Sequence, residues 1–358
     1  MTRFSERSLI ETILRPLSKN SPGAFALGDD AALISPRPGY ELVVTKDALV
    51  AGVHFFADDK PELIAAKALR VNLSDLYAKG ATPAGYLLSL FLPADIGADW
   101  LKAFAAGLKK DQDTYALGLL GGDTVRTPGP FSLSVTMFGE VPEGKMVHRD
   151  GARPGDGIYV SGPIGDAALG LKVAREELQL SDSKDSNYLL QKYLLPDPDP
   201  SLIVPVREYA SAAMDISDGL AGDLTLLCEA SKAGAIVDVS AVPLSSAARK
   251  LIRNRPGLER FRKTGDRFSD KKCGRNNELE PGFDTVKTGN ALISAILTGG
   301  DDYKILCTIP AAHEAAFTGH CGDKLSRIGE IEAGHSSVKF IGRDAQNLSL
   351  EVLSYRHF

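Results

Sequence analysis

Segments typical of helices alternate with segments typical of strands along this chain, and this alternation restricts the fold more than any other feature. "PELIAAKALRVNLSDLYAKGA" (61–81) repeats apolar residues at helical spacing, whereas "FSLSVTMFGEV" (131–141) alternates apolar and polar residues as a strand does. The same criteria predict a helix over 5–15 and a short strand over 115–120. Helices alternating with strands indicate an α/β or α+β fold.

Length and a cluster of turn-forming residues together predict two domains. The chain has 358 residues, more than one hydrophobic core usually serves. Gly, Pro and Asp cluster at 150–157, and a new strand is predicted to begin near Ile158. We therefore expect an N-terminal domain over 1–149 and a C-terminal domain over 150–358.

One segment, 257–289, differs from the rest of the chain. It is highly charged, rich in Gly and Asn, and without hydrophobic periodicity. Such a composition buries too little apolar surface to offset the entropy of ordering, so we expect a solvated, disordered insertion. Its first half is basic, which keeps a nucleic-acid or membrane role as an alternative.

The overall charge and the cysteines exclude several classes of protein. The net charge is −5, so the chain lacks the basic footprint of a nucleic-acid binder. No apolar window is long enough for a transmembrane helix, and the N-terminal segment lacks the apolar core of a signal peptide. The four cysteines show no C-x-x-C spacing, which fits reduced thiols better than a zinc or redox site. We expect a cytoplasmic protein with no nucleic-acid or membrane partner.

Aspartates recur beside small or hydroxyl residues at the ends of apolar stretches. Any one of them is explained by a helix cap or a turn, as when Asp218 caps a helix over 219–232. As a set, strand-terminal aspartates tend to converge at one end of a sheet. The six stretches are "LGDDAALI" (Asp29, Asp30), "VVTKDALV" (Asp47), "NLSDL" (Asp75), "LLGGDT" (Asp123), "AMDISDGL" (Asp215, Asp218) and "LTGGDDYKI" (Asp301, Asp302).

A gathering of carboxylates requires cations. Like charges repel, and oxygen donors without His or Cys select hard ions, Mg²⁺ above all. Because Mg²⁺ completes its coordination with water and substrate phosphates, the set predicts a metal-dependent phosphoryl or nucleotidyl enzyme. The Gly-Gly turns before Asp123 and Asp301 would let the backbone approach a ligand. "VSGPIGDAALGL" (160–171) is either a phosphate-binding helix start or a plain strand-to-helix turn.

A P-loop is excluded, although "GEVPEGKM" (139–146) matches part of its pattern. Met146 replaces the Ser or Thr that holds magnesium, and no helix is predicted to follow. His54 is either a contact for an anionic substrate or a structural histidine beside two phenylalanines. Arg149, at the predicted domain junction, is either a bidentate phosphate donor or an ordinary surface arginine.

Taken in order, these motifs resemble the thiamine-monophosphate kinase family, which belongs to a superfamily with aminoimidazole ribonucleotide synthetase and selenophosphate synthetase. The matching stretches cover nearly the whole chain: "GDDAALI", "TKDALVAGVHF", "KALRVNLSDLYAKGATP", "GGDT", "HRDGARPGD", "VSGPIGDAALGL", "MDISDGLAGDL", "TGGDDYKI" and "SYRHF". The resemblance implies a two-domain aminoimidazole ribonucleotide synthetase-like fold. The N-terminal domain would contribute strands to a dimer barrel, and the C-terminal α/β domain would pack over the nucleotide. It also implies a homodimer, ATP, several Mg²⁺ ions, and in-line phosphoryl transfer to thiamine monophosphate.

The resemblance assigns roles to individual residues. The implied catalytic residues are Asp47, Asp123 and Asp215. Nucleotide contacts fall on Gly122, Asp123, Arg149 and Ser217. Contacts to thiamine monophosphate fall on His54, Asp301 and Tyr355, the last as an aromatic platform. The implied magnesium ligands are Asp30, Thr45, Lys46 through its backbone, Asp47, Asp75, Asp123, Asp215 and Asp218.

The chain departs from the family pattern at three places. Lys46 stands where many members have a second hydroxyl residue, Asp301 replaces a commoner Glu, and "LYAKGA" (76–81) replaces a more apolar turn. Another ATP-dependent enzyme of the superfamily is the alternative function. A selenophosphate synthetase usually relies on an N-terminal Cys, and no Cys precedes Cys228. A non-catalytic binder of metal and nucleotide is a further alternative.

Overall fold

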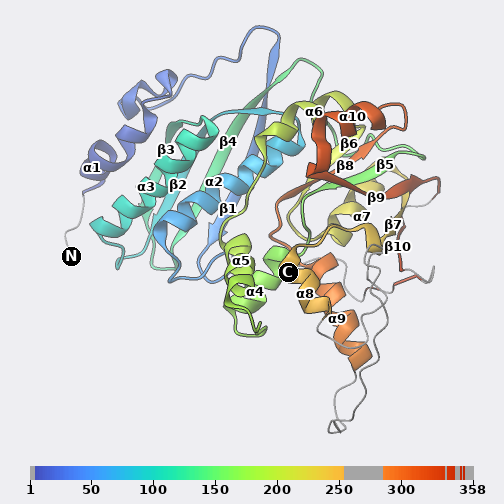
Figure 1. Cartoon of the computed structure of the whole chain (residues 1–358). Helices are drawn as coiled ribbons and strands as arrows, with labels where there is room; N and C mark the ends of the chain where they lie inside the picture. The colour runs from blue at the N-terminus through green and yellow to red at the C-terminus, as the bar shows by residue number, and fades with distance from the viewer. Residues whose placement is uncertain (1–4, 254–284, 335–336, 343–346, 349, 351–358) are drawn as a thin grey trace.

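A computed structural model describes residues 5–253, 285–334, 337–342, 347–348 and 350. Within them, two β-sheets with helices packed against them form a mixed α/β fold, so the predicted fold class is confirmed (Figure 1). Most of the predicted insertion, 257–284, and the proposed substrate contact Tyr355 lie outside the described residues.

The first sheet has four strands in the order β1-β4-β2-β3. Strand β4 runs antiparallel to both of its neighbours, and β3 runs parallel to β2. Helices α2 and α3 pack against each other, and α2 packs on β1 and β4. The bounds are β1 Tyr40–Val50, α2 Pro61–Ala78, β2 Thr82–Leu92, α3 Ala98–Tyr115, β3 Leu119–Arg126 and β4 Ser132–Pro142.

Two sequence predictions in this half need correction. The predicted strand over 115–120 corresponds to β3 but was placed too early, because α3 continues to Tyr115 and β3 begins only at Leu119. Ala116 ends the helix in the left-handed conformation, with φ at 55°. The predicted Gly-Gly-Asp turn is also wrong, since these three residues lie inside β3.

The N-terminal segment is helical but irregular. Helix α1 spans only Glu6–Leu9, and a π-helical turn, Ile10–Leu14, and 3-10 turns, Arg15–Ser18 and Pro22–Leu27, follow it. The predicted helix over 5–15 is therefore not one α-helix. Pro16 contributes to this break, because it has no N–H for a helical hydrogen bond and disfavours α geometry before it.

The second sheet has six strands in the order β10-β7-β9-β5-β8-β6. Only β10 and β7 pair in parallel; the other adjacent pairs are antiparallel. Helix α9 begins within the segment predicted to be disordered, so that prediction is wrong over 285–289. The bounds are β5 Gly157–Ser161, α4 Asp166–Ala174, α5 Ser183–Leu194, α6 Ile203–Tyr209, β6 Ala212–Ile216, α7 Leu220–Ser231, β7 Gly234–Asp238, α8 Ser246–Arg253, α9 Thr285–Thr298, β8 Lys304–Ile309, α10 Glu314–Cys321, β9 Leu325–Glu332 and β10 Val338–Ile341.

Helix α2 joins the two halves of the molecule. It contacts β1 and β4 of the first sheet and β6 and β8 of the second, and most of its residues are buried. The buried guanidinium of Arg70 donates to both carboxylate oxygens of Asp111, at 2.7 and 2.9 Å. Such bidentate pairing offsets much of the cost of burying charge. Because α2 packs against both sheets, it can position side chains at the junction of the two halves.

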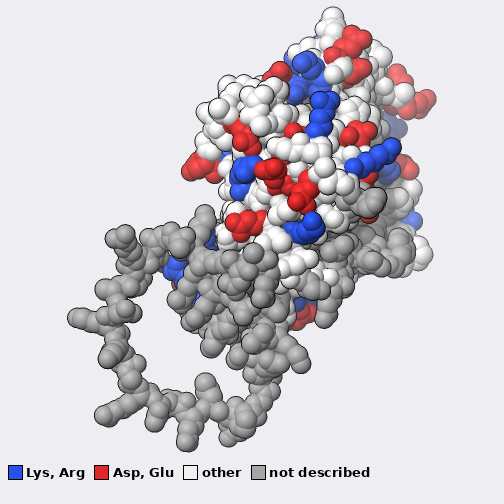
Figure 2. Space-filling view, turned by 90° about the vertical axis from the view of Figure 1, so that its right-hand side faces the viewer, with Lys and Arg blue, Asp and Glu red and all other residues white. Residues whose placement is uncertain are grey.

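The surface carries mixed charge on the face drawn in Figure 2, where Lys and Arg are interspersed with Asp and Glu over the described residues. Of the helices that the structure describes, none is long and apolar enough to cross a bilayer. Cys228, Cys307 and Cys321 are free and buried, which agrees with the expectation of reduced thiols for these three.

Candidate active site

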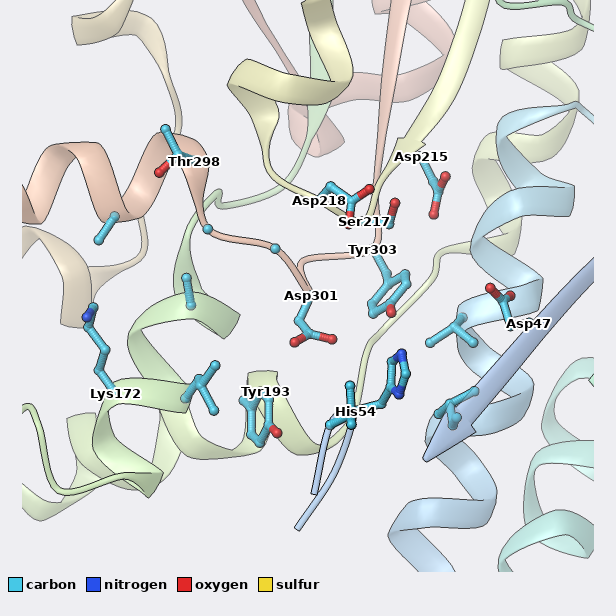
Figure 3. Close-up of a pocket in the computed structure, with 18 of the residues that line it drawn as sticks. Asp47, His54, Lys172, Tyr193, Asp215, Ser217, Asp218, Thr298, Asp301 and Tyr303 are labelled. Atoms are coloured by element: carbon cyan, nitrogen blue, oxygen red, sulfur yellow. The ribbon is translucent and has the colours of Figure 1, made fainter. Parts of the chain in front are cut away.

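A pocket of about 500 Å³ lies where α2 and β1 meet the second half of the molecule (Figure 3). This volume is within the range typical of small-molecule sites. Both halves supply its walls, and much of the predicted residue set is among them. The predicted residues that line the pocket are Asp47, His54, Asp75, Asp215, Ser217, Asp218 and Asp301.

The carboxylates of Asp75 and Asp215 lie against each other at one side of the pocket. Asp75 comes from α2 and Asp215 from β6, and both residues line the pocket. The hydroxyl of Thr45 donates to the Oδ2 of Asp75. Burial, and next the charge of Asp75, raises the pKa of Asp215 well above its ordinary value. Neighbouring carboxylates that disfavour each other's ionisation are stabilised by a bound cation.

Asp47 adds a third acidic group. It lies in β1, three residues before the strand ends, so the prediction that the strand stops at this aspartate is wrong. Burial, and next the charge of Asp75, raises the pKa of Asp47 to about 7. The cluster is therefore one in which several carboxylates repel each other in a partly buried place.

The loop between β6 and α7, which hydrogen bonds hold in place, presents Ser217 and Asp218 to the pocket. The carboxylate of Asp223, in the first turn of α7, accepts hydrogen bonds from the backbone N–H groups of Asp218 and Gly219, both at 3.1 Å. The alternative in which Asp218 caps this helix is therefore wrong, since Gly219 is the N-cap and Asp223 satisfies the N–H groups. A Cβ on Gly219 would lie 2.6 Å from the Thr298 backbone, so only glycine fits between this loop and the end of α9.

The segment between α9 and β8 turns two neighbouring aspartates in different directions. Asp301, with φ at 71°, faces the pocket, and its N–H donates to the Ser217 carbonyl at 2.8 Å. Asp302 instead accepts from the N–H groups of Gly165, at 2.6 Å, and Ala167, at 3.2 Å, where α4 begins. A carboxylate already occupies this helix start, so the plain-turn interpretation of 160–171 holds and the phosphate alternative does not.

His54 follows β1 and points its ring into the pocket (Figure 3). The N–H of Val50 donates to its Nδ1 at 3.1 Å. A neutral imidazole in this position carries its proton on Nε2 and can donate a hydrogen bond there.

Several predicted residues do not line this pocket. Asp30, Gly122, Asp123 and Arg149 are exposed, and the side chain of Lys46 bonds to Ser134 instead. Gly122 has a structural reason to be glycine, because a Cβ there would lie 1.8 Å from the Leu88 carbonyl oxygen across the strand pair. Their predicted roles stay predictions, as does that of Tyr355.

Among the residues in or beside the pocket that were not identified from the sequence are Lys67, Tyr193 and Tyr303. Tyr193 and Tyr303 line the pocket, and Lys67 forms an ion pair with Asp301 just behind its wall. Lys67 had a usable signal, since it is a charged residue inside an otherwise apolar helical stretch. The tyrosines gave none, because an aromatic residue in a helix, such as Tyr193, or beside a strand, such as Tyr303, is usually part of a core.

The donor set fits a hard divalent cation. Thr45, Asp47, Asp75 and Asp215 offer only oxygen atoms, which is the chemistry that Mg²⁺ prefers. Within the described ranges, no three or more His, Cys, Asp or Glu side chains form a ready metal centre. Mg²⁺ sites commonly combine one or two carboxylates with water and substrate phosphates, so a complete protein cage is not required.

Comparison with known proteins gives one family over most of the chain. Residues 28–141 match the model of the AIR synthase related protein N-terminal domain, and residues 153–341 match that of its C-terminal domain. A thiamine-monophosphate kinase of Caulobacter vibrioides is 38% identical over 339 residues, which are 94% of this chain and 86% of that protein.

Solved structures agree. The crystal structure of thiamine-monophosphate kinase from Stenotrophomonas maltophilia K279a superposes with a TM-score of 0.71 at 37% identity and covers 87% of this chain and 89% of that one. AaThiL complexed with AMPPCP and TMP superposes with a TM-score of 0.70 at 28% identity, over 100% of this chain and 99% of that one.

Proposed function

This chain belongs to the thiamine-monophosphate kinase family of AIR synthase-related proteins, and from that premise we propose that it uses ATP to phosphorylate thiamine monophosphate to thiamine diphosphate. The relationship extends over 94% of the chain, so it includes both halves that build the pocket. The observation that carries the proposal is the acidic pocket where these halves meet, because two anionic substrates can approach each other only beside cations.

Mg²⁺ is the metal that the donor set fits. Asp47, Asp75 and Asp215 would hold it, with Thr45 and Asp218 beside them, and the backbone of Lys46, Asp30 and Asp123 would complete the set. Bound there, Mg²⁺ would offset the negative charge of the phosphate oxygens. Several ions are proposed, because the acidic residues are too many for one magnesium that also keeps water and phosphate ligands.

The residues of the chain mainly supply alignment. Phosphoryl transfer involves little covalent chemistry by the protein and depends on placing acceptor and donor in line. The acceptor phosphate of thiamine monophosphate is already ionised near neutral pH, so no strong general base is required. His54 and Asp301 would orient this substrate, with Tyr355 as a platform, while Ser217, Gly122 and Arg149 would contact the nucleotide.

A homodimer is part of the proposal. The face of the first sheet that points away from α2 exposes apolar side chains, with Val44 57% exposed and Phe91 and Val125 each 38% exposed. An apolar sheet face of this kind is typical of a surface covered by another chain. We propose that a second copy covers it, and that the enzyme works in the cytoplasm.

A panel of acceptors tests the function. ADP release would be followed with thiamine monophosphate, with the acceptors of aminoimidazole ribonucleotide synthetase and selenophosphate synthetase, and with no acceptor. The proposal expects release only with thiamine monophosphate and Mg²⁺. Release with another acceptor alone would support the alternative enzyme, and nucleotide binding without release would support a non-catalytic binder.

A further inference from the structure

Lys67 is a buried cation that contacts three walls of the pocket. It lies on α2 and is 2% exposed. Its Nζ lies 3.2 Å from the Oδ1 of Asp301 and donates to the His54 carbonyl oxygen at 2.9 Å. The same nitrogen lies 4.2 Å from the ring centroid of Tyr193, on α5, in a cation–π contact. One ammonium group therefore joins the segment after β1, helix α5 and the loop before β8.

The two partners of the ion pair between Lys67 and Asp301 differ in their exposure to the pocket. The Lys67 side chain is 3% exposed, whereas the Asp301 side chain is 26% exposed and faces the pocket (Figure 3). A buried ammonium is costly unless an opposite charge is close, so Asp301 is held toward Lys67 through Oδ1. The pocket receives the other side of the carboxylate, and the cation stays behind the wall.

The loop that carries Asp301 depends on such fixation. Asp301 and Tyr303 have φ values of 71° and 48°, in a left-handed region that is unfavourable for residues other than glycine. Their N–H groups donate to the carbonyls of Ser217 and Ile216, both at 2.8 Å. The backbone bonds fix the loop against β6, and the ion pair fixes the side chain against α2.

We propose that Lys67 is a positioning residue for the second substrate. It holds Asp301 so that the carboxylate accepts from the amino-bearing, cationic part of thiamine monophosphate rather than from its phosphate. This inference rests on the proposed function. The pocket then has two ends. Lys67 organises the end that binds the organic cation, and the phosphates meet at the other end, beside Asp47, Asp75 and Asp215.

A kinetic double-mutant cycle tests it, with wild type, Lys67→Met, Asp301→Asn and the double variant. Initial rates would be measured while thiamine monophosphate and ATP are each varied at saturation of the other. Without Lys67, the Asp301 carboxylate is no longer held in place to accept from the substrate. Lys67→Met is therefore expected to raise the KM for thiamine monophosphate by about tenfold or more. The KM for ATP is expected to stay within about twofold. The double variant is expected to be no worse than the poorer single variant, because Lys67 acts through Asp301.

A matched control and a charge-retaining variant complete the experiment. Lys192 also lies near a carboxylate, at 3.6 Å from Asp197, and over a tyrosine ring, at 5.6 Å from Tyr188, but outside the pocket. Lys192→Met is expected to leave both KM values unchanged. Lys67→Arg keeps the charge, so its KM for thiamine monophosphate is expected to lie between those of wild type and Lys67→Met. If Lys67→Met does not fold, Lys67→Arg replaces it in the comparison with wild type.

The outcomes separate the two claims. Two results would overturn the role of Lys67 while leaving the proposed function intact. In one, the wild-type protein is active and the losses of the two single variants add in the double variant. In the other, Lys67→Met raises the KM for ATP as much as the KM for thiamine monophosphate. A wild-type protein that makes no thiamine diphosphate would overturn the proposed function and this inference with it.

Discussion

Asp47 and Asp123 lie on opposite faces of the same four-stranded sheet. Asp47 is paired across the sheet with the buried Val135, and its face of the sheet packs on α2. Asp123 pairs with Ser89, which in turn pairs with Ser134, and that residue pairs with Ala48. Laterally paired residues share a face, so Asp123 and the exposed Ala48 point away from α2. In one copy of the chain, these two proposed ligands therefore point from opposite faces of the sheet. In a dimer packed through the exposed face, as proposed above, Asp47 of one copy and Asp123 of the other would share a site.

The first prediction is complementation between subunits. Asp47→Asn and Asp123→Asn are each expected to lower turnover by at least about a hundredfold with the fold retained, because each removes a charge from the metal site. If the site is shared, mixed dimers regain one intact site. Random subunit exchange would then restore about one quarter of the wild-type rate.

The check is the rate of the mixture after the two variants are unfolded and refolded together, against each refolded alone. No recovery in the mixture would contradict a shared site. A wild-type rate in Asp123→Asn alone would remove Asp123 from the proposed ligands.

A second prediction concerns Asp215, which is 8% exposed and faces Asp75. Burial and the charge of Asp75 disfavour the ionised form of Asp215 in the folded state, and Asp215→Asn removes this cost. The metal-free protein is therefore expected to gain stability near neutral pH, with Tm rising by about 2–4 °C. Turnover is expected to fall at least about a hundredfold. Thermal unfolding in EDTA checks the first effect. Asp99→Asn is the control, since the Asp99 side chain is 99% exposed. A lower Tm for Asp215→Asn in EDTA would contradict the repulsion.

The third prediction follows from the pKa of Asp47, which burial and Asp75 raise from 3.8 to about 7. Because the folded state holds the proton more tightly than the unfolded chain, this group makes stability fall as pH rises from about 4 to about 7. In EDTA, Asp47→Asn is therefore expected to gain stability relative to wild type as pH rises through that window. With Mg²⁺ the gain is expected to shrink, because the cation offsets the charge. Tm values of both proteins from pH 5 to pH 8 check this, and a gain independent of pH would contradict it.

Lys79 carries the fourth prediction. Its Nζ donates to the Ala213 carbonyl at 2.6 Å, and so ties the end of α2, which holds Asp75, to β6, which holds Asp215. Lys79→Met is expected to lower stability by about 1–3 kcal/mol, since it leaves a carbonyl unpaired and removes a cation near the carboxylates. The loss is expected to be smaller with Mg²⁺. Chemical denaturation with and without Mg²⁺ checks this, with the exposed Lys145→Met as control. If Lys79→Met lowers the free energy of unfolding equally with and without Mg²⁺, the role of Lys79 is purely structural, and its effect on the carboxylates is contradicted.

Much of the fold and of the pocket was predictable from local pattern. The helical spacing of apolar residues in 61–81 predicted α2, and the alternation of 131–141 predicted β4, because burial of one face leaves a periodic trace. The aspartates beside small residues predicted a shared acidic site, and Asp47, Asp75 and Asp215 do meet in one pocket. The physical reason is that a set of like charges has few structural uses other than binding a cation.

Long-range arrangement was not predictable in the same way. The Gly-Gly-Asp stretch was assigned to a turn, yet it lies within β3, because Gly122 allows a close approach of Leu88 that the local sequence does not reveal. The face on which Asp123 points depends on strand register, which is fixed by pairing with β2. Lys67 was visible in the sequence as a charge within an apolar stretch, but its pairing with Asp301 was not predictable, since Asp301 is far away in the sequence.

The most direct measurement of the central claim is phosphorus-31 NMR of the purified protein with ATP, thiamine monophosphate and Mg²⁺, beside Asp47→Asn and an EDTA control. The account predicts that wild type forms thiamine diphosphate and ADP in equal amounts, that EDTA stops the reaction, and that Asp47→Asn slows it at least about a hundredfold. Equal rates for Asp47→Asn and wild type, or ADP formed without thiamine diphosphate, would contradict it.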